Sequence, residues 1–265
     1  MSTADFAARL RNRQPVLGYW SVIDSPVSTE WLAHIGWDYI ALDLQHGLIG
    51  YDGMLRGLTA IDSAHGPAGI IRVEANDMTP IGRALDAGAA GVIVPLIDTA
   101  DDAARAVSAT RYPPTGVRSY GPMRSQLRIG PAPADANRDT AVIAMIETPL
   151  GLENVEAICA VTGLDAVYVG PSDLRLAVGG ASPSDMSVDD QFEAALTRIH
   201  EAAAAAGIAA GIHTPSGDVA AQRLSQGYTF ASVASDLTHL KAVSSAHLKA
   251  ALGKQVTRLP ARSQA

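Results

Sequence analysis

Residues 141–174 read AVIAMIETPLGLENVEAICAVTGLDAVYVGPSDL and contain the pattern that decides the fold. Two short runs rich in Val and Ile, AVIAMIE (141–147) and AVYVGP (166–171), flank a segment with the apolar spacing of a helix. Runs that are apolar throughout, rather than alternating, are typical of parallel strands buried on both faces. This stretch therefore predicts a β–α–β unit of a parallel sheet.

The same unit recurs along the whole chain, because eight such runs occur and helical patterns lie between them. This repetition predicts an α/β protein with one (β/α)8 barrel, and the lack of GxGxxG after the first run argues against a dinucleotide-binding fold. We expect a single domain over residues 1–265, with an extra N-terminal helix over 1–14 and a C-terminal tail over 253–265. The eight runs span 16–22, 38–44, 69–74, 91–97, 141–147, 166–171, 209–213 and 229–235.

Composition excludes several classes of function. The chain has 265 residues, 48% of them hydrophobic, and a net charge of −7, which argues against disorder and against nucleic-acid or membrane-surface binding. The single cysteine, Cys159, permits no internal disulfide and no cysteine-based metal cluster. No signal-like start and no apolar run of about 18 residues is present. We therefore expect a soluble cytoplasmic protein.

The basic residues are almost all arginines. Only three of the 20 are lysines, namely Lys241, Lys249 and Lys254, and all three lie in the last 25 residues. A Schiff-base aldolase needs a lysine at a strand end inside the barrel. The sequence therefore excludes that covalent mechanism.

Polar side chains stand at the predicted carboxyl ends of the strands, where (β/α)8 enzymes place their chemistry. Glu147 and Asp173 follow neighbouring strands, so we expect their carboxylates to meet over the barrel axis. Two carboxylates without sulfur or imidazole suit a hard divalent cation, Mg²⁺ or Mn²⁺, with Co²⁺ as a further option. The alternative interpretation is a proton-sharing acid pair or separate salt bridges to arginines.

Arg72 and His46 follow the third and second strands. Arg72 offers a planar fork of donors for a carboxylate or enolate oxygen, or alternatively an internal salt bridge to Glu74 or Glu147. His46 is a candidate proton carrier, with an ordinary loop histidine as the alternative. His213, at the end of the seventh strand, is interpreted as a pocket wall rather than a base. A chelated 2-oxo acid, an arginine and a histidine together indicate metal–enolate chemistry.

Five segments of the chain together resemble the HpcH/HpaI family of metal-dependent 2-oxo acid aldolases, typified by 4-hydroxy-2-oxoheptanedioate aldolase. The resemblance extends over about residues 5–252 and implies a (β/α)8 barrel. It implies cleavage or formation of a 4-hydroxy-2-oxo acid, with pyruvate and an aldehyde as the other partners, through a metal-stabilised pyruvate enolate. It also implies a homo-oligomer, commonly a hexamer. The segments are LDLQH (42–46), IIRV (70–73), RYPPTGVRS (111–119), IET (146–148) and GPSDL (170–174).

The resemblance implies catalytic roles for three residues. His46 matches the family's base, Arg72 its transition-state stabiliser, and Asp86 an aspartate that raises the basicity of the histidine. Our strand and helix assignment places Asp86 away from the mouth of the barrel. It could act there only if the backbone departs from that assignment or a neighbouring subunit supplies it.

The resemblance also implies the ligand contacts. Glu147 and Asp173 match metal ligands, Ser172 matches a position that binds the oxo acid through its backbone, and Trp20 lines the acceptor pocket. Asp173 and Met145 complete the expected substrate-binding set. Met145 replaces the family's substrate-binding glutamine, and a thioether cannot replace an amide donor.

A second departure is Gln45, which stands where the family has an acidic residue before the histidine. With Met145, it affects the expected substrate more than the reaction class. Two alternative functions stay open. One is an acyl-CoA carbon–carbon lyase of the citrate lyase β type, although few positive residues flank the strand ends for a CoA groove. The other is a non-catalytic barrel that senses a metal–oxo acid complex.

Overall fold

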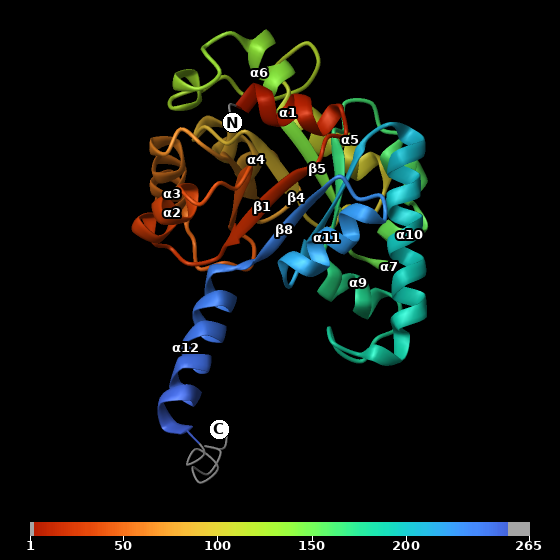
Figure 1. Cartoon of the computed structure of the whole chain (residues 1–265). Coiled ribbons are helices and arrows are strands. Elements are labelled where there is room, and N and C mark those ends of the chain that lie inside the picture. The colour runs from red at the N-terminus through yellow and green to blue at the C-terminus, as the bar shows by residue number, and fades with distance from the viewer. Residues whose placement is uncertain (1–2, 254–265) are drawn as a thin grey trace.

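The computed structural model describes residues 3–253 and contains eight parallel strands that close into a barrel in sequence order (Figure 1). Each strand lies on one of the eight apolar runs, which confirms the predicted (β/α)8 fold. The predicted tail over 253–265 lies outside the described residues, apart from Gly253. The strands are β1 (Val16–Ser21), β2 (Tyr39–Asp43), β3 (Ala68–Arg72), β4 (Gly91–Val94), β5 (Ala141–Ile146), β6 (Ala166–Val169), β7 (Ala209–Thr214) and β8 (Phe230–Ser235).

Helices connect consecutive strands and pack around the barrel (Figure 1). Between residues 3 and 253 no helix combines the length and the apolar character that a membrane crossing requires. The helices are α1 (Thr3–Arg11), α2 (Pro26–Ala33), α3 (Tyr51–Ser63), α4 (Met78–Asp86), α5 (Ala100–Thr110), α6 (Pro133–Asp139), α7 (Pro149–Glu153), α8 (Val155–Cys159), α9 (Pro171–Ala177), α10 (Asp189–Ala206), α11 (Gly217–Ser225) and α12 (Asp236–Leu252).

The barrel interior is filled by side chains from alternate strand positions, as the pleat requires. Tyr39 and Phe230 are fully buried there. Gly18 provides the room, because a Cβ on it would lie 2.2 Å from the Tyr39 ring. At the amino end of the strands, Phe6 and Leu10 of α1 are fully buried in the same cluster. The expected N-terminal helix therefore closes the bottom of the barrel.

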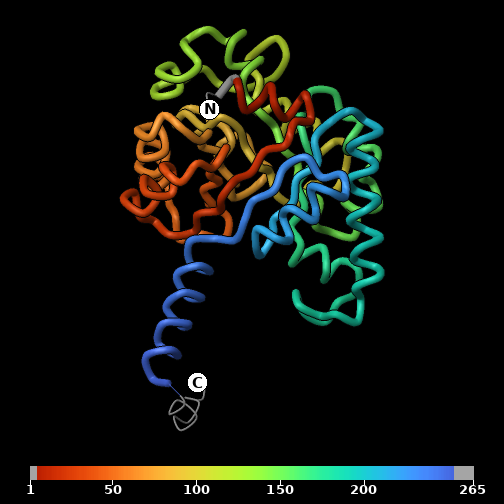
Figure 2. The backbone as a smooth tube through the Cα atoms, viewed as in Figure 1, coloured from red at the N-terminus to blue at the C-terminus, as the bar shows by residue number. Residues whose placement is uncertain are grey.

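The long connection before β5, which includes α6, lies beside α1 at this same end (Figure 2). Ion pairs attach it to the barrel helices. Arg118 pairs with Asp86 at 2.7 Å, and Arg124 and Arg128 pair with Asp62 at 2.5 Å and 2.7 Å. These loop arginines therefore lie far from the carboxyl ends of the strands within this chain.

The last helix, α12, projects away from the barrel (Figures 1 and 2). Its first residue is anchored, because Asp236 accepts hydrogen bonds from the Ser21 hydroxyl at 2.8 Å and the Val22 amide at 3.0 Å. Asp236 is the only residue of α12 that is buried. The helix thus exposes almost its whole circumference.

Candidate active site

A cavity of about 180 Å³ lies at the carboxyl end of the strands. Because all eight strands are parallel and closed, this end collects the residues that follow each strand. Six of the residues predicted for the site, from five different strand ends, lie around this one cavity. The lining consists of Trp20, His46, Arg72, Met145, Tyr168, Gly170, Pro171, Ser172, Asp173 and His213.

Asp43, at the end of β2, holds the guanidinium of Arg72. The two residues face each other in the parallel register of β2 and β3. Arg72 Nε donates to Asp43 Oδ1 at 2.9 Å, and Arg72 Nη2 donates to Oδ2. The internal salt bridge considered for Arg72 is therefore made to Asp43, not to Glu74 or Glu147. Among the described residues Nη1 has no hydrogen-bond partner, so this side of the fork stays available to a ligand.

Asp43 also organises the two flanking site residues. It accepts from the indole Nε1 of Trp20 at 3.2 Å and from the backbone N–H groups of Gln45 and His46 at 3.0 and 3.1 Å. Burial opposes ionisation, but these bonds and the charge of Arg72 outweigh it and lower the pKa of Asp43. The sequence alone assigns no role to Asp43, although its place at the end of β2, one strand away from Arg72, points to such a pairing.

Aromatic packing fixes the floor of the cavity. The Trp20 ring stacks on Tyr168 with centroids 5.8 Å apart, and the Arg72 guanidinium lies 5.1 Å from the Trp20 centroid. Met145 is almost fully buried and lines the same floor. Met145 therefore lies at the cavity, and its contact with substrate stays a prediction.

His46 lies at the rim, where its side chain is exposed and lines the cavity. Its ring makes no hydrogen bond to the described residues, while its backbone is held by Asp43. The imidazole is thus free to meet a ligand proton directly or through a water molecule.

Glu147 is buried directly after β5. Its Oε1 accepts from the backbone N–H of Leu96 at 2.9 Å. Burial raises the pKa of Glu147, and the negative charge of Asp173 raises it further. Gly170 lets the other oxygen approach the backbone closely, because a Cβ on this residue would lie 2.6 Å from Glu147 Oε2.

These features fit a sparsely held divalent cation. The negative charge of Asp173 opposes ionisation of the buried Glu147, and a divalent cation held by the two carboxylates would offset that repulsion. Across residues 3–253 no cluster of three or more His, Cys, Asp or Glu side chains is arranged to enclose a metal. Glu147 and Asp173 stay the predicted ligands, and two protein ligands would leave about four octahedral positions for water and substrate.

Asp86 is not brought to the cavity within this chain. It is the last residue of α4, and this helix runs back from the carboxyl end of β3 to the amino end of β4. There it accepts from Arg118 Nη2 at 2.7 Å. Burial raises the pKa of Asp86, against the opposing effect of Arg118. A role for Asp86 beside His46 stays a prediction that requires a second copy of the chain.

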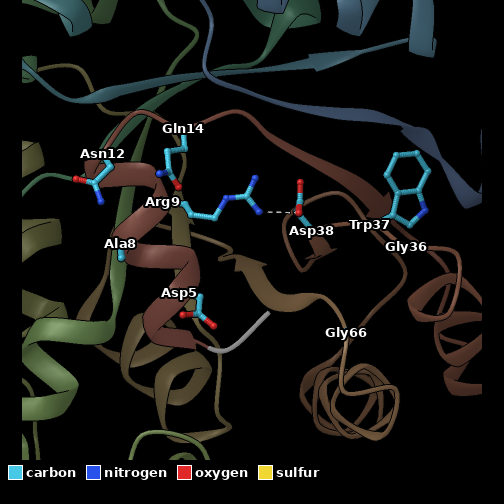
Figure 3. Close-up of a pocket in the computed structure, with 9 residues that line it drawn as sticks. All are labelled: Asp5, Ala8, Arg9, Asn12, Gln14, Gly36, Trp37, Asp38 and Gly66. Atoms are coloured by element: carbon cyan, nitrogen blue, oxygen red, sulfur yellow. Dashed lines mark hydrogen bonds and ion pairs between the residues drawn. The ribbon is translucent and has the colours of Figure 1, made fainter.

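A larger cavity, of about 670 Å³, lies at the amino end between α1 and the segment before β2 (Figure 3). It contains none of the predicted site residues. Its Arg9 is paired with Asp38 at 2.8 Å and also donates to the Pro15 carbonyl. Because (β/α)8 enzymes place their active sites at the carboxyl ends of the strands, this cavity is a weaker candidate for the active site.

Known proteins resemble the chain over most of its length. The model of the HpcH/HpaI aldolase/citrate lyase family matches residues 17–242. A hydroxypyruvate/pyruvate aldolase of Rhizorhabdus wittichii is 36% identical over 230 residues, which are 86% of this chain and 91% of that protein. A 5-keto-4-deoxy-D-glucarate aldolase of Salmonella paratyphi C is 36% identical over 244 residues, 89% and 92% of the two chains.

Solved structures agree with these matches. A HpcH/HpaI aldolase/citrate lyase family protein from Burkholderia cenocepacia superposes with a TM-score of 0.84 at 32% identity. The superposition covers 94% of this chain and all of that one.

Proposed function

The chain belongs to the HpcH/HpaI aldolase/citrate lyase family, and from this premise we propose that it is a divalent-metal-dependent pyruvate aldolase. As a carbon–carbon lyase it would cleave, or form, a 4-hydroxy-2-oxo acid, with pyruvate and an aldehyde as the other partners. One observation supports this most directly. A single cavity is lined by a histidine, an arginine and a carboxylate, His46, Arg72 and Asp173, and a second carboxylate is buried close by.

Arg72 orients and stabilises the oxo acid in this proposal. Its fork is held by Asp43, so little reorganisation is needed when negative charge develops on the enolate oxygen. We expect Nη1, which has no hydrogen-bond partner among the described residues, to donate to that oxygen. Ser172 and Met145 line the same cavity and bound the pyruvate portion.

His46 moves the proton. In cleavage it takes the proton from the 4-hydroxyl, directly or through water, as the bond between C3 and C4 breaks. The resulting enolate then gains one proton at C3, from the imidazolium or from water, to give pyruvate. In the reverse direction His46 returns a proton to the aldehyde oxygen. The exposure of His46 beside the cavity supports this role, because an imidazole that solvent reaches can both take up and release a proton.

Glu147 and Asp173 would hold the divalent cation, Mg²⁺ or Mn²⁺. When bound, such an ion supplies Lewis-acid polarisation of the keto and carboxylate oxygens of the substrate. The protein's own contribution would be the buried carboxylate of Glu147 and the exposed carboxylate of Asp173, which lines the cavity.

Metal removal tests this function. We expect the purified protein to release pyruvate from 4-hydroxy-2-oxo acids, to lose that activity in excess EDTA, and to regain it with Mg²⁺ or Mn²⁺. Pyruvate release is followed by a coupled reduction to lactate. Activity that survives full chelation contradicts the metal mechanism. Turnover of an acyl-CoA thioester instead indicates the citrate lyase β function, and ligand binding without turnover indicates a sensor.

We further propose that the protein is a homo-oligomer, with the hexamer implied by the family resemblance as the expected stoichiometry. The exposed α12 supports this, because Leu240 and Leu248 are 59% and 62% exposed. Leu17 on the outer side of β1 and Trp31 on α2 are exposed as well, at 37% and 75%.

Light scattering on the intact chain should give a mass above that of one copy, and Leu240→Glu should lower that mass. A monomeric wild-type protein contradicts the proposal. The cytoplasmic location stays a prediction from the sequence.

A further inference from the structure

His213, at the end of β7, lies on the wall between two cavities. One is the cavity of about 180 Å³ described above. The other is an adjoining cavity of about 380 Å³ bounded by β7, α9, α10 and α11. Pro171 and Ser172 line both cavities together with His213. A ligand that begins beside Arg72 and is longer than pyruvate would therefore meet the imidazole of His213 where the two cavities adjoin.

The imidazole of His213 is positioned but not hydrogen-bonded. Its ring packs edge-on against Trp20 with centroids 5.4 Å apart. Its Nδ1 is buried without a hydrogen-bond partner, and no described residue bonds to the other ring nitrogen. A buried polar atom without a partner is costly, and such atoms in native structures often await a ligand or a water molecule.

The ring is uncharged at neutral pH. Burial, together with the positive charge of Arg72, lowers the pKa of His213 to about 4, against the opposing charge of Asp43. A neutral imidazole has one donor and one acceptor nitrogen. This pairing suits a hydroxyl group, which both donates and accepts, better than it suits a carboxylate.

The adjoining cavity does not offer a free positive charge. Its two arginines are engaged, because Arg175 pairs with Asp189 at 2.5 Å and Arg223 pairs with Glu193 at 2.6 Å. Thr214 and other lining residues are neutral. The cavity therefore fits an uncharged polar chain rather than an anionic one.

We propose that His213 is a specificity-determining residue that hydrogen-bonds a hydroxyl group of the acceptor aldehyde, so that neutral hydroxyaldehydes are preferred to alkyl aldehydes. The inference rests on the proposed aldolase function and names the acceptor class for the same site. In the addition reaction, C3 of pyruvate loses one proton and forms a bond to the aldehyde carbon. The aldehyde oxygen gains one proton, so no further reactant is required.

The test compares glycolaldehyde with propanal, which differ by a hydroxyl in place of a methyl group. Both are added to pyruvate by the metal-loaded intact chain, and the ratio of their kcat/KM values is measured. We expect His213→Leu to lower the ratio of glycolaldehyde to propanal by about tenfold, the effect of one neutral hydrogen bond. His213→Asn keeps a donor and an acceptor and should retain most of the ratio. Hydration lowers the concentration of free aldehyde, but this effect cancels when the ratio is compared between variants, because every variant is assayed in the same aldehyde solutions.

The inference is overturned if His213→Leu leaves the glycolaldehyde-to-propanal ratio of kcat/KM unchanged. It is also overturned if His213→Leu and His213→Asn lower this ratio equally. Exchange of the pyruvate methyl protons in D₂O separates these results from a failure of the aldolase function, because exchange reports the enolate step without any aldehyde. If the wild-type protein exchanges the methyl protons but His213→Leu leaves the ratio unchanged, only the role of His213 is contradicted and the aldolase function stands. A wild-type protein that neither exchanges nor condenses contradicts the proposed function, and the acceptor role with it.

Discussion

Glu147→Gln is expected to weaken Mg²⁺ or Mn²⁺ binding by more than about 100-fold and to lower aldol cleavage by about 10³-fold, since the Lewis-acid contribution is worth several kcal/mol. The amide has the same shape as the carboxylate and can still accept from the Leu96 N–H group. It lacks the negative charge that a divalent ligand needs. Calorimetric titration of each cation and the pyruvate-release assay measure the two effects.

Although Glu147→Gln should weaken cation binding and activity, it should not lower the stability of the metal-free protein. The pKa of Glu147 in the folded state is raised by burial and by Asp173. A carboxyl group whose pKa is higher in the folded than in the unfolded state destabilises the fold once pH rises through these two pKa values. The neutral amide of Glu147→Gln should therefore maintain or raise the Tm of the metal-free protein at neutral pH. Added cation should raise the Tm of the wild-type protein but not that of Glu147→Gln.

Glu74→Gln is the matched control, because Glu74 follows β3 near the same mouth but is exposed. It should leave cation affinity and the thermal shift unchanged. Wild-type cation affinity in Glu147→Gln would show that Glu147 is not a ligand, and the proposed metal centre would have to be reassigned.

His46→Ala is expected to lower kcat for aldol cleavage by about 10²- to 10⁴-fold, the usual contribution of a general base. Cation affinity should stay near that of the wild-type protein, because the metal ligands are assigned to Glu147 and Asp173. The fold should tolerate the change, since the exposed ring makes no hydrogen bond to the described residues and Asp43 bonds only to the backbone of His46.

Two measurements distinguish a base from a ligand. Calorimetry gives the cation affinity of His46→Ala, and the coupled assay gives its kcat. His34→Ala serves as control, because His34 is an exposed residue at the end of α2 and should leave both values unchanged. A parallel loss of cation binding in His46→Ala would identify His46 as a ligand rather than the base.

The barrel was predictable because its signal is local. A strand buried on both faces must be apolar at consecutive positions, so each of the eight strands appears as a short continuous run between helical patterns. The site was partly predictable for the same reason. Closure of parallel strands brings every strand end to one mouth, so His46, Arg72 and Asp173 could be expected together.

Pairings between strand ends were not predictable to the same degree. Asp43 was visible in the sequence, but its bonds to Arg72, Trp20 and the backbone of His46 depend on side-chain rotamers and on the register of β2 against β3. Likewise, the sequence offers Glu74 and Glu147 as partners for Arg72, whereas the ion pair in the folded barrel is made with Asp43, one strand away.

The sequence by itself determined the (β/α)8 architecture, the exclusion of a lysine-based mechanism, and the set of polar residues at the mouth, because strand burial and residue chemistry are properties of short segments. Only the tertiary structure decided that Asp86 pairs with Arg118 at the opposite end, that α12 leaves the barrel, and that His213 lies between two cavities. These features arise from contacts between segments distant in the chain, whose relative positions are set by packing and not by local pattern.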